Sequence, residues 1–166
     1  MWAVAAGERF AAGERFAAWE RFAAWESWDH AAGIAADAER GGIMRTTDKR
    51  EVFKVIDDYM KGNYRADGVL LKSTFHENAV VNGYLYSELS MGDSKPLIEK
   101  VASSPSMEST GESYRITVEH LLIKENVASV IVIESGFKDR HEQIDCFHLI
   151  KVEGIWSIIA CLFTTY

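Results

Sequence analysis

The sequence contains little cysteine: only Cys146 and Cys161 among 166 residues. Two cysteines cannot build the disulfide framework of a small secreted domain, and their spacing matches no metal-binding motif. We therefore expect two reduced thiols and no metal site. Nearly half of the residues, 48%, are hydrophobic, which is ordinary for a globular protein and excludes a wholly disordered chain.

Basic clusters and long apolar runs are also missing. The formal net charge is −7, and no group of lysines and arginines supplies the basic surface that nucleic acids or anionic membranes require. No stretch reaches the roughly twenty apolar residues of a membrane span, and Glu-Arg pairs interrupt the N-terminus where a signal peptide needs an apolar run. We expect a soluble, cytoplasmic protein that binds neither nucleic acid nor membrane.

The N-terminus instead contains a hexamer repeat, GERFAAGERFAAWERFAAWESW at residues 7–28. Six residues advance a helix by about 600°, so the repeated phenylalanines would point in different directions, and the alternation of a strand is absent. Residues 1–43 are therefore interpreted as an arm and linker, disordered or partly helical. Two hypotheses stay open: a segment foreign to the functional protein, or a tryptophan-bearing arm that docks on a partner. The functional domain is expected at 44–166.

The remaining residues change from helical to strand patterns along the chain. Helical spacing of apolar residues predicts helices at 48–63, 68–75 and 96–103, the first with a capping box at Asp48 and Glu51 and the third with Ser94 as N-cap. Residues 79–89 are interpreted as one strand. Four consecutive antiparallel strands are expected at 114–123, 126–135, 141–152 and 154–166, which are rich in β-branched and aromatic residues. The order predicts an α+β domain whose helices cover one face of a curved sheet and leave a hollow for a ligand.

Two segments resemble a known superfamily: YMKGNYRADGVLLKSTFHENAVVNG and the terminal IDCFHLIKVEGIWSIIACLF. They contain Y-x-x-G, F-H-x-x-A and D-x-x-x-L-x-K-x-x-G-x-W, as in the putative lumazine-binding branch of the nuclear transport factor 2-like superfamily, which includes ketosteroid isomerase and scytalone dehydratase. The resemblance covers Val52 to Phe163. It implies a cone-shaped fold, with a strongly curved mixed or antiparallel sheet wrapped around N-terminal helices, a pocket, and a homodimer formed through the outer face of the sheet.

The comparison with ketosteroid isomerase assigns candidate catalytic residues. That resemblance implies Tyr59 and Asp145 as the two hydrogen-bond donors to a substrate oxygen, and it puts Gly83 where the carboxylate base should be. Since a general base contributes about 10²–10⁴-fold, steroid isomerisation is not expected. A histidine could replace the base. His148 lies on the opposite strand face from Asp145, so His76, which the resemblance places near the pocket mouth, is preferred over His148 and His120.

Each candidate also has a structural interpretation. Asp145 could be a neutral pocket acid, a carboxylate paired with a basic group, or a residue at an exposed edge. Tyr59 could line the pocket with Phe147 or pack in the core. His76 could cap or support the helix-to-strand junction. Tyr84 and Tyr86 share a strand face that is either pocket or dimer surface, and Trp156 is expected in the core.

The expected pairing of the last two strands places the two cysteines opposite each other. If Glu153 and Gly154 form a two-residue hairpin turn, paired residues sum to about 307 and Cys146 faces Cys161. A cross-strand disulfide there would be strained and is disfavoured in the cytoplasm, so two reduced, buried thiols without a catalytic role are expected. Glutamate is an unfavourable first residue for such a turn, so the register could also differ by one.

These observations predict a small-molecule-binding pocket protein without an assignable reaction or cofactor, with ligand contacts from Tyr59, Tyr84, Tyr86, Asp145 and Phe147. Two alternatives stay open. One is a lyase or isomerase, similar to a dehydratase or cyclase, in which Tyr59 and Asp145 donate hydrogen bonds and His76 or a water moves the proton. The other is a non-catalytic dimerisation or protein-docking module with a filled hollow.

Overall fold

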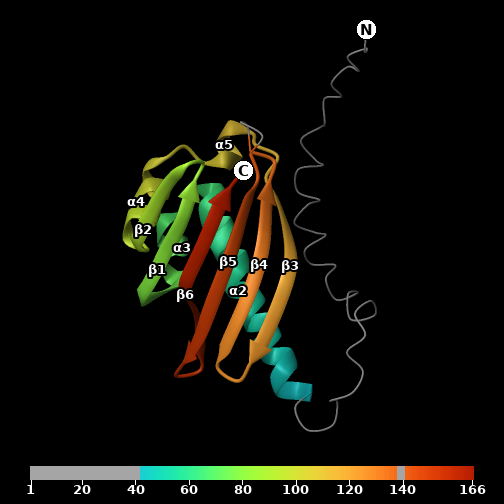
Figure 1. The fold of residues 1–166 in the computed structure, drawn as a ribbon. Coiled ribbons are helices and arrows are strands. Elements are labelled where there is room, and N and C mark those ends of the chain that lie inside the picture. Colours follow the sequence, from blue (N-terminus) through green and yellow to red (C-terminus); the bar gives the residue numbers. More distant parts are fainter. Residues whose placement is uncertain (1–41, 138–140) are drawn as a thin grey trace. The chain divides into compact units, whose positions relative to one another are not determined.

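The computed structural model describes residues 42–137 and 141–166 of the chain, with side chains from residue 47 onward. Residues 1–41, which hold the hexamer repeat, lie outside the described residues, so both hypotheses for the arm stay predictions. The described elements form an α+β domain in which helices cover one face of a six-stranded sheet (Figure 1). The predicted class is therefore confirmed.

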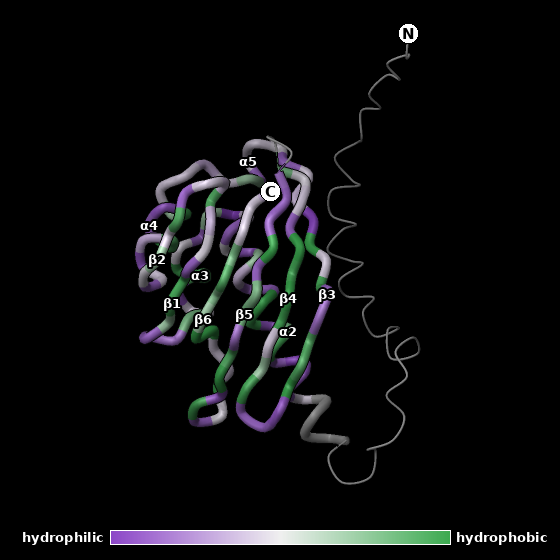
Figure 2. The backbone as a smooth tube through the Cα atoms, viewed as in Figure 1, coloured by the Kyte–Doolittle hydropathy of each residue, from purple (hydrophilic) through white to green (hydrophobic). Residues whose placement is uncertain are grey.

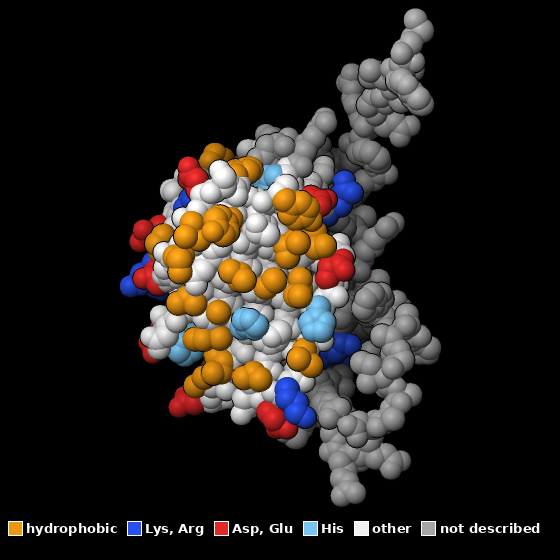
Figure 3. Space-filling view, in the orientation of Figure 1, with side chains coloured by type: hydrophobic (Ala, Val, Ile, Leu, Met, Phe, Trp, Pro, Cys, Tyr) orange, Lys and Arg blue, Asp and Glu red, His pale blue; other side chains and the backbone are white. Residues whose placement is uncertain are grey.

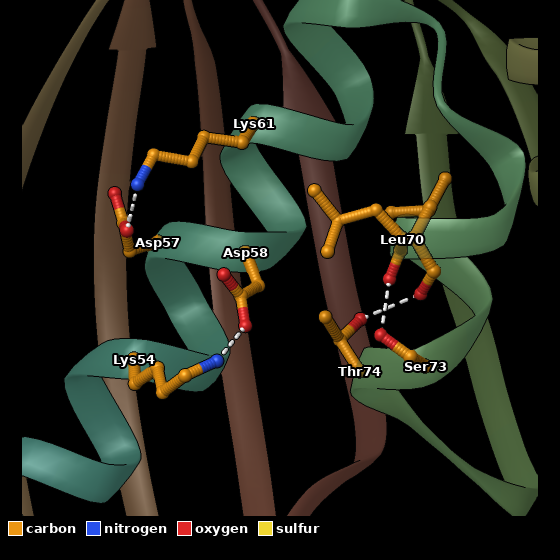
Figure 4. Close-up of polar contacts among 8 residues, drawn as sticks. Lys54, Asp57, Asp58, Lys61, Leu70, Ser73 and Thr74 are labelled. Atoms are coloured by element: carbon orange, nitrogen blue, oxygen red, sulfur yellow. Dashed lines mark hydrogen bonds and ion pairs between the residues drawn. The ribbon is translucent and has the colours of Figure 1, made fainter.

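Helix α2, Gly42–Arg65, is the longest helix of the domain. Its buried stripe consists of Val52, Ile56, Tyr59 and Met60, which are at most 2% exposed, as helical spacing predicts. Ion pairs join Lys54 to Asp58 and Lys61 to Asp57 on the other side of the helix (Figure 4). Ion pairs of this kind, four residues apart on the surface of a helix, contribute about 0.3–0.5 kcal/mol each.

The predicted capping box at the start of this helix is wrong. The helix is already formed six residues before Asp48. The carboxylate of Asp48 instead accepts hydrogen bonds from Lys151 Nζ at 2.5 Å and from Trp156 Nε1 at 3.1 Å. Because Lys151 and Trp156 flank the hairpin between the last two strands, Asp48 fixes the helix to the sheet rather than capping it.

Helix α3, Gly68–Thr74, follows directly and packs on α2. Asp67 is its N-cap, with Oδ1 accepting from the backbone N of Val69 at 3.1 Å and of Leu70 at 2.9 Å, which satisfies two free amide groups. A Cβ at Gly62 would lie 3.0 Å from the Cα of Leu71. Glycine therefore permits the close contact between the two helices.

The sheet contains six strands in the order β2-β1-β6-β5-β4-β3 and does not close. Strands β3 Arg115–Lys124, β4 Val127–Ser135, β5 Gln143–Val152 and β6 Ile155–Thr165 are consecutive and antiparallel, as predicted. Strand β1, Phe75–Leu85, pairs parallel with β6, which makes the sheet mixed (Figure 1).

The single strand predicted at 79–89 is in fact a hairpin. After β1 the chain turns at Tyr86 and Ser87, and β2, Glu88–Asp93, returns antiparallel. The turn was missed because Tyr86 adopts a left-handed φ of 55°, a conformation that tyrosine does not signal. Helix α4, Lys95–Ser103, agrees with prediction, although Ser94 makes no side-chain capping bond. The short helix α5, Met107–Thr110, was not predicted.

The side chains of the sheet alternate between a helix-covered face and an uncovered face. Apolar positions recur along the strands beneath α2 (Figure 2). The covered face contributes most of the core, including Val81, Val130, Val132, Phe147, Leu149 and Ile158. This alternation follows from the two-residue period of a strand.

The predicted turn at Glu153 and Gly154 is confirmed, since Val152 pairs with Ile155, but the cysteine register is wrong. A bulge at Ile159, between the pairs formed by His148 and Leu149, adds one residue to β6. Cys146 consequently faces Leu162, and Cys161 faces Phe147. Both cysteines are free, Cys161 buried and Cys146 half-buried.

Candidate functional site

Two carboxyl groups lie buried on the covered face, where β4 ends and β5 begins. Asp145 pairs with Val132 and Glu134 pairs with Gln143, so the two acids are diagonal neighbours on one face of adjacent strands. Glu134 is 3% exposed and Asp145 is fully buried. Burying two acids side by side is costly unless they are hydrogen-bonded or neutralised.

Each acid has one neutral hydrogen-bond donor. The hydroxyl of Tyr114 donates to Glu134 Oε2 at 2.7 Å, and Gln143 Nε2 donates to Asp145 Oδ1 at 3.0 Å. The other two oxygens, Glu134 Oε1 and Asp145 Oδ2, find no donor among the described residues. Two ionised carboxylates are both acceptors, so these oxygens can satisfy each other only when one group carries a proton.

The proton belongs on Glu134. Burial raises the pKa of Glu134 well above its usual value, and the charge of Asp145 and the hydrogen bond between the two carboxyl groups raise it further. Burial also raises the pKa of Asp145, but hydrogen bonds from Glu134 and Gln143 oppose that rise. The pair thus presents one acid and one carboxylate, the arrangement of two like groups that cannot both ionise.

Tyr59 lies on α2 beside this pair. Its ring meets Phe147 edge-on at 4.8 Å between centroids and Phe75 at 5.7 Å. Burial, followed by the nearby charge of Asp145, raises the pKa of Tyr59 well above its usual value. Tyr59 is therefore a neutral hydroxyl that packs against Phe147 and lies within the electrostatic influence of Asp145.

Aromatic rings form a continuous row at the same end of the sheet. Tyr64 stacks on Tyr114 at 5.7 Å, Tyr114 meets Phe137 edge-on at 5.6 Å, and Phe137 stacks on His141 at 4.2 Å. Tyr86 adds an edge contact to His141 at 5.5 Å. Because Tyr114 also donates to Glu134, this aromatic row and the carboxyl pair are joined in one cluster.

The remaining predicted residues lie elsewhere. Nδ1 of His76 accepts a hydrogen bond from the backbone N of Asn78 at 3.1 Å. His76 therefore supports the backbone just after the junction between helix α3 and strand β1, which is the structural interpretation considered for it. Tyr84 and Tyr86 are 49% and 55% exposed, and they do not share a strand face because Tyr86 lies in the turn. A Cβ at Gly83 would lie 2.0 Å from the carbonyl oxygen of Phe163, so this backbone leaves no room for a carboxylate there.

The other histidines are on the uncovered face. His148 is exposed, unlike Asp145 three residues earlier, which confirms the predicted separation of the two, and its Nδ1 lies 2.9 Å from Ser129 Oγ. His120 is exposed on β3. Trp156 is buried, as predicted.

Sequence reasoning missed Glu134, Tyr114 and Gln143. A signal for Glu134 exists: the inward positions of β4 run Ala128, Val130, Val132 and then Glu134, so an acid occupies a position that the two-residue period assigns to the core. Tyr114 precedes its strand and has no such signal. Chemically, the cluster offers a neutral acid, a carboxylate and two phenols, which can hold a polar group and exchange one proton with it.

Within the described part of the chain, no three His, Cys, Asp or Glu side chains are grouped so as to hold a metal ion. Over the same residues, no helix combines the length and apolarity needed to cross a membrane.

Comparison with known proteins identifies both a family and a fold. The family profile described as "Putative lumazine-binding" matches residues 47–164. A nuclear transport factor 2-like protein of unknown function from Shewanella baltica is 21% identical, with 73% of this chain and 95% of that chain covered at a TM-score of 0.63. A similar protein of unknown function from Silicibacter pomeroyi is 15% identical, with 74% and 98% covered and a TM-score of 0.65.

A ketosteroid isomerase-like protein from Erwinia carotovora is 16% identical, with 70% of this chain and 94% of that chain covered at a TM-score of 0.53. No curated protein matches the chain. The structural neighbours establish a nuclear transport factor 2-like fold, and at these identities they establish no activity.

Proposed function

Because the chain belongs to the putative lumazine-binding family, we propose that it is a small-molecule-binding protein whose ligand is held on the covered face of the sheet. The observation that carries this proposal is the buried pair of Glu134 and Asp145, each with one oxygen that no other described residue satisfies. Tyr59 and Phe147 pack beside the pair and would contact the ligand together with Asp145.

A purely structural role for the pair is unfavourable. Apolar residues of similar volume commonly stabilise a core as well as buried ionic groups do, or better by about 1–4 kcal/mol. Val130 and Val132 on β4 show that apolar side chains fit the same face. Two acids at its end therefore cost stability, and recognition of a polar ligand, a planar heterocycle or a carbonyl compound, accounts for that cost.

Native mass spectrometry of the full chain purified from cells tests the proposal. We expect a mass above that of the polypeptide, released as a small molecule on denaturation. The Asp145→Asn variant should lose this mass, whereas Asp58→Asn, at an ion-paired position on the other side of α2, should retain it. A wild-type protein that carries no molecule and gains no thermal stability from a panel of planar heterocycles and carbonyl compounds would contradict the proposal.

A second candidate is a lyase or isomerase in which Tyr59 and the one O–H of the Glu134–Asp145 pair donate hydrogen bonds to a substrate oxygen, a role that the sequence comparison had assigned to Tyr59 and Asp145. One observation favours an enzyme more than the sequence did. The comparison with ketosteroid isomerase placed Gly83, which has no titratable group, at the position of the base, whereas the structure adds the titratable Glu134 beside Asp145. Glu134 would then move the proton in place of His76, whose ring is engaged by Asn78. The test is whether the wild-type protein converts the molecule found by native mass spectrometry into a product. Conversion by the wild type that is lost in Glu134→Gln, while this variant still binds the molecule, would support an enzyme.

We also propose that two copies of the chain associate through the uncovered face of the sheet. Apolar side chains gather on this face and charged ones lie mainly at its margin (Figure 3). Leu122 and Leu162 are 56% and 59% exposed there, and like-charged copies could approach across a face with so few carboxylates. Light scattering after size exclusion should give the dimer mass for the wild type and the monomer mass for Leu162→Glu. A wild-type monomer at high concentration would refute the association.

The third reading, a docking module with a filled hollow, has less support. A hollow filled by Phe147, Trp156 and Leu162 would favour it; Phe147 and Trp156 are buried, but Leu162 faces the exterior. We further propose a cytoplasmic location, which the two free cysteines support; a periplasmic or extracellular location in a cell-fractionation experiment would refute it.

A further inference from the structure

The uncovered face of the sheet carries a histidine on one of its central strands. Strands β6 and β5 are the two central strands of the order, and His148 is exposed on β5. Histidine side chains lie among the apolar ones of this face (Figure 3). We propose that protonation of His148 separates the two copies that associate through this face, so that the dimer is present at neutral pH and lost in mild acid. This inference rests on the proposed association and adds its regulation.

The side chains next to His148 on this face cannot compensate the charge of a proton. Its direct cross-strand partners are Ser129 on β4 and Ala160 on β6. The diagonal positions of the same face are also uncharged: Val127 and Ile131 on β4, Ser157 and Leu162 on β6. Cys146, two residues earlier on β5, is titratable, but burial raises the pKa of its thiol, which therefore stays neutral. A protonated His148 has no anionic partner at these positions.

The other charged or titratable groups on or beside this face are farther away. They lie on strands two or more places from β5 or in the hairpin turns: Arg115, Glu119, His120 and Lys124 on β3, His76 and Glu77 on β1, Asp93 on β2, and Glu125 and Glu153 in the turns. Since neighbouring strands lie about 4.8 Å apart, two places correspond to about 10 Å. Asp93 is three places away, and its Oδ1 already accepts from the backbone N of Lys95 at 2.9 Å.

A second copy on this face makes the two forms of His148 unequal in free energy. Nδ1 of His148 lies 2.9 Å from Ser129 Oγ, so the neutral ring keeps a hydrogen bond when it is covered. The protonated ring would bring an unpaired charge into an apolar interface, which is far more costly. A two-fold interface presents the same patch from both copies, so the dimer would bury two such charges. The central strands of the other copy add no partner, because their one acid, Asp145, is on the covered face.

The direction of the effect distinguishes this mechanism from general charge repulsion. Each chain has a formal net charge of −7, so added protons reduce the repulsion between copies and by themselves favour association. A histidine that must be neutral in the interface has the opposite effect. Two separate chains then bind more protons than the dimer, so acid favours the separate chains. Histidine ordinarily changes charge between pH 5 and pH 8, and the dimer should be lost within this range.

Sedimentation equilibrium of the full chain, from about pH 8 down to about pH 5.5, tests the inference. If one ordinary histidine per copy must be neutral, the dissociation constant of the dimer should rise about a hundredfold between about pH 7.5 and about pH 5.5. His148→Gln keeps a polar side chain that does not titrate, so this variant should not dissociate in acid. His120→Gln, on the edge strand β3 of the same face, is the matched control and should dissociate in acid as the wild type does.

The outcomes separate the regulation from the association. Equal or tighter association of the wild type in acid would overturn the inference and keep the dimer, as would dissociation of His148→Gln in acid or a pH dependence removed by His120→Gln instead. Circular dichroism at each pH shows whether the separated chains are folded, and acid unfolding in place of dissociation would also overturn the inference. A wild type that stays monomeric at about pH 8 and high concentration would remove the association and its regulation together.

Discussion

The two faces of the sheet distribute polar and apolar side chains in opposite ways. Under the helices, where apolar residues are expected, Glu134 and Asp145 are buried. On the uncovered face, where polar residues are expected, Leu122 and Leu162 are more than half exposed. Both departures cost stability or solubility. The comparison teaches that the proposed ligand contacts and the proposed contact with a second copy lie on different sides of one sheet.

The largest effect should come from removing a large side chain from the covered face. Phe147 is fully buried against Tyr59, so Phe147→Ala should lower the free energy of unfolding by about 3–5 kcal/mol. Leu162→Ala on the uncovered face of the neighbouring strand should change it by no more than about 0.5 kcal/mol in the monomer. Urea unfolding measures both; comparable losses would show that the uncovered face also carries the core.

The carboxyl pair itself should respond to single and double substitution differently. Asp145→Val leaves Glu134 Oε1 and the amide of Gln143 without their partner, and should cost about 1–3 kcal/mol. Combining it with Glu134→Leu removes both acids, and the double variant should unfold at higher urea than the single one.

Thermal and urea unfolding of the three proteins check this order. Equal stability of the single variant and the wild type would mean that the two acids do not depend on each other. A double variant less stable than Asp145→Val would mean that the pair is a net stabilising element.

The pH dependence of stability should reverse the usual behaviour of carboxylates. Because burial raises the pKa of Glu134, the folded protein keeps a proton that the unfolded chain has released. Unfolding therefore releases a proton between the ordinary carboxyl pKa and the raised one, and stability falls as pH rises through this window, by up to about 1.4 kcal/mol per pH unit. The raised pKa of Asp145 acts in the same direction.

Urea midpoints measured at intervals from about pH 5 to about pH 8 test this sign. Glu134→Gln should flatten the profile, since its amide does not titrate. At lower pH the profile should turn over, because the hydrogen bond from Lys151 lowers the pKa of Asp48 and that contribution is lost as pH falls. If the wild-type stability instead rises steadily from pH 5 to pH 8, Glu134 does not hold the additional proton in the folded protein, and the prediction is wrong.

The difference between the two faces was only partly predictable from sequence. The strand period separates Asp145 from His148 correctly, because a two-residue alternation needs only local order. The same reasoning failed for Cys146 and Cys161, since one bulge at Ile159 shifts every pair beyond it. Bulges have no reliable local signature, and register depends on packing against the helices.

The candidate site shows the same limit. Tyr59 and Asp145 could be proposed because the resemblance to ketosteroid isomerase implies them as hydrogen-bond donors, and the residue pattern alone would not have selected them. Tyr114 reaches the site only because β3 runs antiparallel to β4 and brings Tyr114 beside Glu134, twenty positions later in the sequence. A contact between residues that distant is a property of topology, which no single stretch of sequence encodes.

The smallest effect should come from the exposed counterpart of the buried acid pair. Ser129 and His148 form a cross-strand hydrogen bond of 2.9 Å on the uncovered face, where water can replace either partner. Ser129→Ala should therefore change the free energy of unfolding of the monomer by less than about 0.5 kcal/mol, against about 1–3 kcal/mol for Asp145→Val. Urea unfolding at neutral pH measures both. If Ser129→Ala cost as much as the buried substitution in monomer and dimer alike, the polar pair on the uncovered face would be structural, and the division of roles between the two faces would fail.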